Sequence, residues 1–178
     1  MRKIVGIGLM VFIFTTVGVS LVKGMTEKPV EPFEIIIDNS SKEGFTTKGQ
    51  WMSDQGQGGQ NYGTDSLWAY VNPKGTDIAW WRPNLPKDGY YEVFIWYCGD
   101  PNNDHATNAP FIVVSDGKTD TFAIDLKKNY GKWNSLGIFR FRKGDKGYVS
   151  TNSGGNGNAI ADAVKFVFVG TRKPKETK

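Results

Sequence analysis

Residues 89–97 read GYYEVFIWY, and this stretch of sequence decides the fold. After Gly89, every residue except Glu92 is aromatic or β-branched. Such residues favour β-strands, and apolar side chains at both odd and even positions are typical of a strand that is covered on both faces. The stretch therefore predicts a central strand of a β-sheet.

Similar segments lie on both sides of this strand, and Gly, Asn and Asp residues separate them. Their patterns predict short strands at residues 34–38, 49–53, 67–71, 76–82, 111–115, 118–126, 136–142, 147–151 and 161–169. No convincing helical pattern interrupts this series. We therefore expect an all-β fold, one antiparallel, jelly-roll-like β-sandwich over residues 34–169.

Two local patterns make this expectation more specific. Asp116-Gly117 separates two strand segments, and a two-residue Asp-Gly loop predicts a β-hairpin because both positions tolerate positive φ. Trp80 and Trp81 are adjacent on a predicted strand, so their side chains point to opposite faces of the sheet. At least one of these two indoles is therefore expected outside the core.

The chain begins with an apolar segment. Nineteen uncharged residues, 4–22, follow two basic residues and precede Lys23. A helix of this length nearly matches the roughly 30 Å hydrocarbon core of a membrane, whereas the apolar part of a signal peptide is typically shorter. We expect residues 1–24 to form a hydrophobic helix that is either a cleaved signal peptide or a membrane anchor.

Both alternatives have the same consequence for location. Positive charges before the apolar segment stay inside, so everything after Lys23 is expected to be extracytoplasmic, either secreted or held at the membrane. Residues 25–33 are expected to form a spacer because they are rich in Pro and Glu. Residues 170–178 are expected to form a basic tail.

The composition excludes a nucleic-acid-binding surface and a disulfide framework. The whole chain has a formal net charge of +4, but residues 33–170 contain 14 Lys and Arg against 15 Asp and Glu, a net charge of −1. Neutralising phosphates requires a basic surface, so no nucleic-acid partner is expected. The single cysteine, Cys98, cannot form an intrachain disulfide and is expected to be a small buried residue.

Several spaced motifs resemble one known family. In chain order they are Asp38-Asn39, Gly44-Phe45, Gly49-x-Trp51, residues 80–86 (WWRPNLP), 89–93 (GYYEV) with Trp96, 106–110 (ATNAP), 131–141 (GKWNSLGIFRF) and 160–166 (IADAVKF). Together they resemble the golvesin and xanthan-lyase C-terminal domain, which is carbohydrate-binding-module-like, over about residues 34–169. The resemblance implies a β-sandwich and, by analogy, carbohydrate binding. Because Trp96 and Trp133 lie inside these motifs, we expect both indoles in the core.

Five residues are candidates for ligand binding. Tyr62 and Trp68 flank the Gly-rich part of the chain that begins at residue 54 (DQGQGGQNYG), where the backbone can approach a ligand closely. Their rings could supply the flat apolar face on which a sugar stacks. Asn61, His105 and Asn108 carry polar groups that match hydroxyls, the last two provided that their loop reaches the same end of the sandwich.

No pattern supports catalysis or a cofactor. His105 is the only histidine. The sequence contains no Gly-x-Ser-x-Gly elbow and no spacing that indicates a catalytic pair of carboxylates. Asp100-x-Asn102-x-Asp104 starts like a calcium loop, but His105 and Phe111 occupy the positions that require Gly and Glu, so a turn is preferred. We therefore expect no catalytic residue, no cofactor and no metal site.

These observations favour a non-catalytic extracytoplasmic binding module for a polysaccharide or cell-envelope glycan. The alternative is a structural or protein-interaction module of a surface or secretion assembly, with a surface protein as its partner. A ring platform surrounded by Asn and Asp would favour the glycan, whereas a flat, exposed apolar patch would favour the protein.

Overall fold

The computed structural model describes residues 33–57, 59–100 and 102–174. Every regular element in these ranges is a strand, so the all-β prediction is confirmed. The predicted N-terminal helix and residues 25–32 of the predicted spacer lie outside the described residues. The described ranges contain no helix long and apolar enough to cross a membrane.

The strands are short and follow one another closely along the chain. Their bounds are β1 Glu34–Asp38, β2 Phe45–Lys48, β3 Met52–Ser53, β4 Leu67–Ala69, β5 Ile78–Trp81, β6 Gly89–Trp96, β7 Ala109–Ser115, β8 Lys118–Ile124, β9 Asn134–Phe141, β10 Tyr148–Asn152, β11 Ala159–Ala161 and β12 Ala163–Gly170.

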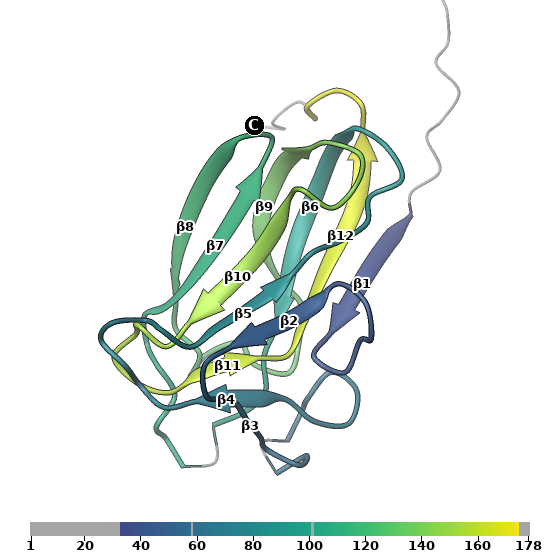
Figure 1. Cartoon of the computed structure of the whole chain (residues 1–178). Coiled ribbons are helices and arrows are strands. Elements are labelled where there is room, and N and C mark those ends of the chain that lie inside the picture. Colours follow the sequence, from purple (N-terminus) through teal and green to yellow (C-terminus); the bar gives the residue numbers. More distant parts are fainter. Residues whose placement is uncertain (1–32, 58, 101, 175–178) are drawn as a thin grey trace, which may run out of the picture.

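The strands form three antiparallel sheets. The four-stranded sheet has the order β1-β12-β6-β9, the five-stranded sheet β2-β5-β10-β7-β8, and the small sheet β11-β4-β3. All strand pairs within these sheets are antiparallel. In Figure 1 the two larger sheets form two layers, and the small sheet lies at one end of them.

The core lies between the two larger sheets, as in a β-sandwich. On β6, which pairs with both β12 and β9, the side chains of Tyr91, Val93 and Ile95 are fully buried. Trp81 of β5 and Phe111 of β7 stack with ring centroids 6.4 Å apart and belong to the same hydrophobic cluster. The stretch 89–97 thus provides the central strand that its sequence predicts, and burial of this apolar surface stabilises the fold.

The prediction that Trp96 and Trp133 lie in the core was wrong. Side chains alternate along a strand, so Trp96 points to the opposite side of β6 from Ile95. Both indoles are half-buried and pack against each other, with ring centroids 5.4 Å apart. The family motifs that contain them therefore include residues on the outer face of the sheet as well as residues on its core face.

The last predicted strand, residues 161–169, is in fact two strands. β11 ends at Ala161 in the small sheet, and β12 begins at Ala163 in the four-stranded sheet. Asp162 lies between them and is 1% exposed. The chain thus passes from one sheet to another at a buried acidic residue, which a continuous apolar pattern does not reveal.

The predicted strand 49–53 is shorter, and one strand was not predicted. Gly49 has a φ of 88°, and the Gln50 N–H donates a hydrogen bond to Asp77 Oδ1 at 2.8 Å, so the chain turns before β3 begins. β2 was missed because three of its four residues are polar and exposed. It pairs with β5 at the edge of the five-stranded sheet.

Both local predictions are confirmed. Asp116 and Gly117 have φ values of 42° and 77° and join β7 to β8 in a hairpin. Trp81 is 1% exposed, whereas Trp80 is half-buried on the other face, where the Arg82 guanidinium lies 6.0 Å from its ring centroid.

Candidate ligand-binding site

The small sheet lies at one end of the molecule (Figure 1). Together with two loops it lines a pocket. Its cavity of about 370 Å³ falls within the roughly 300–1,000 Å³ typical of ligand pockets. Trp68 of β4 and Ile160 of β11 are direct partners across the small sheet and form its apolar wall. The complete lining comprises Ser53, Asp54, Gln55, Gln57, Trp68, Asn102, Asp104, His105, Asn158 and Ile160.

Trp68 supplies the largest ring in this lining. It is half-buried, and the exposed ring of Tyr70 meets it edge to face, with centroids 4.8 Å apart. Amide and carboxylate groups of the two loops surround the remaining surface of the pocket. This combination of a flat apolar wall and polar groups suits a ligand that has an apolar face and several hydroxyls.

Asp54 holds the first loop. Its Oδ1 accepts hydrogen bonds from the backbone N–H groups of Gly56 at 2.9 Å and Ser66 at 2.8 Å. Its Oδ2 accepts a bond from the Asn61 side-chain amide at 3.1 Å. The loop that carries Gln55 and Gln57 is thereby fixed against the segment that leads into β4.

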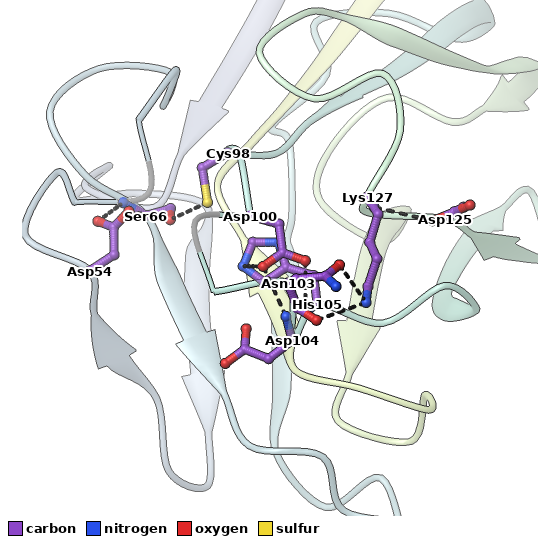
Figure 2. Close-up of polar contacts among 9 residues, drawn as sticks. All are labelled: Asp54, Ser66, Cys98, Asp100, Asn103, Asp104, His105, Asp125 and Lys127. Carbon is purple, nitrogen blue, oxygen red and sulfur yellow. Dashed lines mark hydrogen bonds and ion pairs between the residues drawn. The ribbon is translucent and has the colours of Figure 1, made fainter.

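Asp100 holds the second loop, between β6 and β7. Its carboxylate accepts the backbone N–H groups of Asp104 and His105, each at 3.0 Å, and the His105 Nε2 lies 4.0 Å from Asp100 Oδ1 (Figure 2). These bonds confirm that the Asp100–Asp104 segment forms a turn. His105 also makes a parallel β-bridge with Asn158, which brings this loop against the small sheet.

His105 is buried but incompletely bonded. Its side chain is 8% exposed, and its Nδ1 has no hydrogen-bond partner among the described residues. Burial lowers the pKa of His105, although the charges of Asp100 and Asp104 oppose this effect. The imidazole is therefore neutral near pH 7.

The charges at the pocket are negative. Asp54 and Asp104 are part of the lining, and no described lining residue is Lys or Arg. The nearby Lys127 ammonium donates instead to the Asn103 carbonyl at 2.9 Å and to Asn103 Oδ1 at 3.0 Å. In Figure 2 the Asp104 carboxylate points away from Lys127, although the charge of Lys127 still acts on His105.

Three side chains of the second loop have a spacing that could hold a metal ion. One possible ligand atom from each of Asp100, Asp104 and His105 lies within 4.8 Å of the others. However, both carboxylate oxygens of Asp100 already accept backbone N–H groups of the turn. This carboxylate therefore has a structural role that requires no ion.

Tyr62 lies in a different place, which we call the outer aromatic cluster and which consists of Tyr62, Trp96 and Trp133. Its ring centroid lies 5.7 Å from that of Trp96 and 5.1 Å from that of Trp133. The Trp96 Nε1 donates to the Gln60 carbonyl at 2.8 Å, and the Lys165 ammonium lies 4.6 Å from the Trp133 ring centroid. These contacts cover much of the three rings and leave Tyr62 outside the pocket lining.

The structure thus divides the five predicted ligand residues. Trp68 and His105 line the pocket together. Asn61 bonds to Asp54 and supports the first loop. Asn108 accepts the Asn156 N–H at 2.7 Å in a contact between loops and, like Tyr62, does not line the pocket.

Several lining residues were not singled out from the sequence. Asn158 and Ile160 reach the pocket only because β11 pairs with β4, a contact between residues far apart in the chain. The sequence pattern relates Asp104 only to a turn or a calcium loop, although it is exposed at the pocket. Asp54 could have been recognised as the first residue of the Gly-rich stretch, where a carboxylate often accepts the N–H group two residues later.

Cys98 and Asp162 are titratable groups that are buried outside the lining. Cys98 is 1% exposed, and burial raises the pKa of its thiol to about 12, so it is the inert buried residue that the sequence predicts. Burial, together with neighbouring carboxylates, raises the pKa of Asp162 to about 8. The Tyr62 N–H donates to Asp162 Oδ2 at 3.2 Å, whereas Asp162 Oδ1 has no partner among the described residues.

This arrangement of sheets is shared with carbohydrate-binding modules. The family 35 carbohydrate-binding module from Clostridium thermocellum matches with a TM-score of 0.50 at 8% identity, over 74% of this chain and 97% of the module. The C-terminal family 6 module of LamC, a marine laminarinase from Zobellia galactanivorans, matches with a TM-score of 0.50 at 10% identity, over 76% of this chain and 99% of the module. At such low identity the likeness establishes the fold alone.

The chain belongs to the Golvesin C-terminal domain family, whose model matches residues 35–168, so the family indicated by the motifs is confirmed. It is 34% identical over 154 residues to a xanthan lyase from Bacillus sp. (strain GL1). This match covers 82% of this chain and 16% of that relative. The structure of a Paenibacillus xanthan lyase matches with a TM-score of 0.71 at 33% identity, over 77% of this chain and 13% of the lyase. The chain thus spans a small part of each lyase.

Proposed function

We propose that this chain is a binding module for a polysaccharide or cell-envelope glycan and that the glycan binds in the pocket lined by Trp68. The observation that carries the proposal is the composition of that pocket. A half-buried indole forms one wall, and amides, carboxylates and an imidazole surround it. The C–H face of a sugar would stack on the indole while its hydroxyls bond to the polar groups.

The comparisons support this proposal at the level of fold and family. The solved modules that share the fold are named for carbohydrate binding, and the relatives of higher identity are named as xanthan lyases. Neither name fixes a ligand for this chain, because a fold hosts many functions. The ligand class is therefore inferred from the residues that line the pocket.

The charge of the pocket favours neutral sugars or amino sugars over acidic ones. A bound uronate would bring its carboxylate close to Asp54 and Asp104, without a lysine or arginine in the described lining to offset the repulsion. A protonated amine on a sugar would instead be attracted. We expect the Asp104→Asn exchange to weaken binding of an amino sugar more than binding of a neutral one.

The proposed role is extracytoplasmic and non-catalytic. The apolar segment at residues 4–22 would deliver the rest of the chain out of the cytoplasm as a signal peptide or an anchor. In the pocket, Asp54 is engaged by the N–H groups of its own loop and His105 is buried and neutral. The proposal assigns these groups to holding the loop and contacting the ligand.

A glycan array probed with the full chain tests this function, with neutral, amino and acidic polysaccharides and xanthan among the probes. We expect binding to a neutral or amino glycan, no cleavage of it, and an affinity reduced at least tenfold, about 1.4 kcal/mol, by Trp68→Ala. Trp80→Ala is the matched control, because Trp80 is also half-buried but does not line the pocket. The proposal fails if no glycan binds, or if the two variants bind equally well.

A further inference from the structure

Tyr70 presents an aromatic ring to solvent one residue beyond the end of β4. Its side chain is 64% exposed, and that of the following Val71 is also exposed. Ala69 is fully buried between Trp68 and Tyr70, because successive side chains of an extended chain point to opposite faces. Trp68 and Tyr70 therefore share the face of the small sheet that is turned away from the core.

Tyr70 and Val71 line a cavity of about 460 Å³, which we call the second hollow. The Tyr70 ring meets the Trp68 ring edge to face, with centroids 4.8 Å apart. The Val71 N–H donates at 3.3 Å to Asn158 Oδ1, and Asn158 lines the pocket of Trp68. Two direct contacts thus join the second hollow to that pocket. The remaining residues of its lining are Gln50, Asn72, Pro73, Thr76 and Asp77.

Hydrogen bonds hold the wall of the second hollow in place. The Asn72 N–H donates to the Ser153 carbonyl at 2.8 Å, and the Asn72 carbonyl accepts the Gly75 N–H at 2.7 Å. The Asp77 carboxylate accepts the Gln50 N–H and the Ser153 hydroxyl, each at 2.8 Å. A wall that is fixed before a ligand arrives lowers the entropic cost of binding.

The second hollow offers the same kinds of chemical group as the pocket lined by Trp68. An exposed aromatic ring lies beside amide, hydroxyl and carboxylate groups, and Gln50 and Thr76 are also exposed. No described residue of its lining is Lys or Arg. The bonds from Gln50 and Ser153 lower the pKa of Asp77, so its carboxylate is negative near pH 7. These groups suit a sugar that carries hydroxyls and no negative charge.

We propose that the glycan site continues over Tyr70 into the second hollow and binds at least two consecutive sugars of a neutral chain. One sugar stacks on Trp68 and the next stacks on Tyr70, where Gln50 and Thr76 contact its hydroxyls. Because both sugars belong to one chain, the second set of contacts raises the affinity without a second loss of translational freedom. This inference rests on the proposed function and extends it to a longer ligand.

The angle between the two rings selects the shape of that chain. The planes of Trp68 and Tyr70 make an angle of 83°. A sugar that stacks on a ring lies parallel to it, so the two consecutive sugars are strongly turned relative to each other. Chains of cellulose and chitin extend as flat ribbons, whereas chains of xylan and laminarin twist about their axes. The site therefore favours a twisted chain over a flat ribbon.

Calorimetry with the full chain tests this, with oligosaccharides of cellulose, chitin, xylan and laminarin from one to six sugars long as the probes. We expect the tightest binding from the xylan or laminarin series, with at least a tenfold gain in affinity from the monosaccharide to the trisaccharide. Tyr70→Ala should remove this gain and leave the melting temperature unchanged, because the side chain is largely exposed. Tyr70→Phe keeps the ring and should bind like the parent chain.

Tyr130→Ala is the matched control, because Tyr130 is also exposed but lines neither cavity. It should bind every oligosaccharide like the parent chain. The proposal is overturned if Tyr70→Ala binds the longer oligosaccharides as tightly as the parent, if a flat series binds most tightly, or if none of the four series binds. Loss of binding in Trp68→Ala but not in Tyr70→Ala would leave the proposed function intact and exclude the second hollow alone.

Discussion

The outer aromatic cluster and the pocket both include aromatic residues from neighbouring parts of the chain, and these aromatic rings have different surroundings. Tyr62 precedes the turn into β4 and is covered by Trp96 and Trp133. Trp68, six residues later, lines a cavity of about 370 Å³. An aromatic residue beside a Gly-rich loop is therefore available to a ligand only where its neighbours leave part of its ring uncovered.

Strand pairing produces this difference. Trp68 lies on β4 between Met52 of β3 and Ile160 of β11, so its ring stands on a sheet face that the loop of His105 faces across the cavity. Tyr62 meets two other large rings on the outer face of the four-stranded sheet. The rings of the outer aromatic cluster thus cover one another, whereas Trp68 packs against the hydrophobic core and also forms a cavity wall.

The largest effect is expected for a tryptophan that belongs to neither region. Trp81 is 1% exposed, its Nε1 donates to the Asp162 carbonyl at 3.2 Å, and it stacks on Phe111. We expect Trp81→Ala to lower the free energy of unfolding by about 3–5 kcal/mol, measured by denaturant titration. A variant as stable as the parent would contradict the assignment of the core between the two larger sheets.

A smaller loss of stability is expected in the outer aromatic cluster. Trp133→Ala removes contacts with Tyr62, Trp96 and Lys165, but its ring is only half-buried. We expect a loss of about 1–3 kcal/mol by the same measurement. Trp68 packs against the hydrophobic core, so Trp68→Ala should also lower stability, and the contrast between the two regions lies in ligand binding. A Trp133→Ala variant as stable as the parent would mean that the outer aromatic cluster does not stabilise the fold.

The smallest expected effect is on the pH dependence of stability, and it comes from His105. Burial lowers the pKa of His105 in the folded chain below its unfolded value of about 6.5, so below that pH the unfolded chain binds the proton more readily. The contribution of neutral His105 to stability is present above about pH 6.5 and is lost as the pH falls towards the folded pKa.

Melting temperatures of the parent and of His105→Asn, measured between pH 7.5 and pH 5, check this expectation. The parent should lose more stability than the variant over this range, because only the parent carries the buried imidazole. Parallel curves would mean that Asp100 and Asp104 offset the burial of the ring completely.

Much of the fold could be predicted from local patterns. The stretch 89–97 identified the central strand, and Asp116-Gly117 identified a hairpin, because both signals depend on residues that are adjacent in the chain. Spaced motifs identified the family that the comparison confirms. The sequence misled where the outer face of a sheet also carries large rings, as at Trp96 and Trp133.

The candidate site was only partly predictable, for a physical reason. Trp68 and His105 are candidates from their residue types alone. Asn158 and Ile160, in contrast, become neighbours of Trp68 only through pairing of β11 with β4. The interruption at Asp162 separates β11 from β12, which belong to different sheets, and no local sequence pattern predicts it. Contacts between distant segments build the pocket, and a linear pattern does not contain them.

The most direct test of the comparison measures affinity and stability together for Trp68→Ala and Trp133→Ala, with the glycan that the array identifies. The account predicts that Trp68→Ala binds at least tenfold more weakly, about 1.4 kcal/mol, whereas Trp133→Ala binds like the parent even though it melts at a lower temperature. If Trp133→Ala is the variant that loses affinity while Trp68→Ala keeps it, the ligand binds at the outer aromatic cluster and the central claim is contradicted.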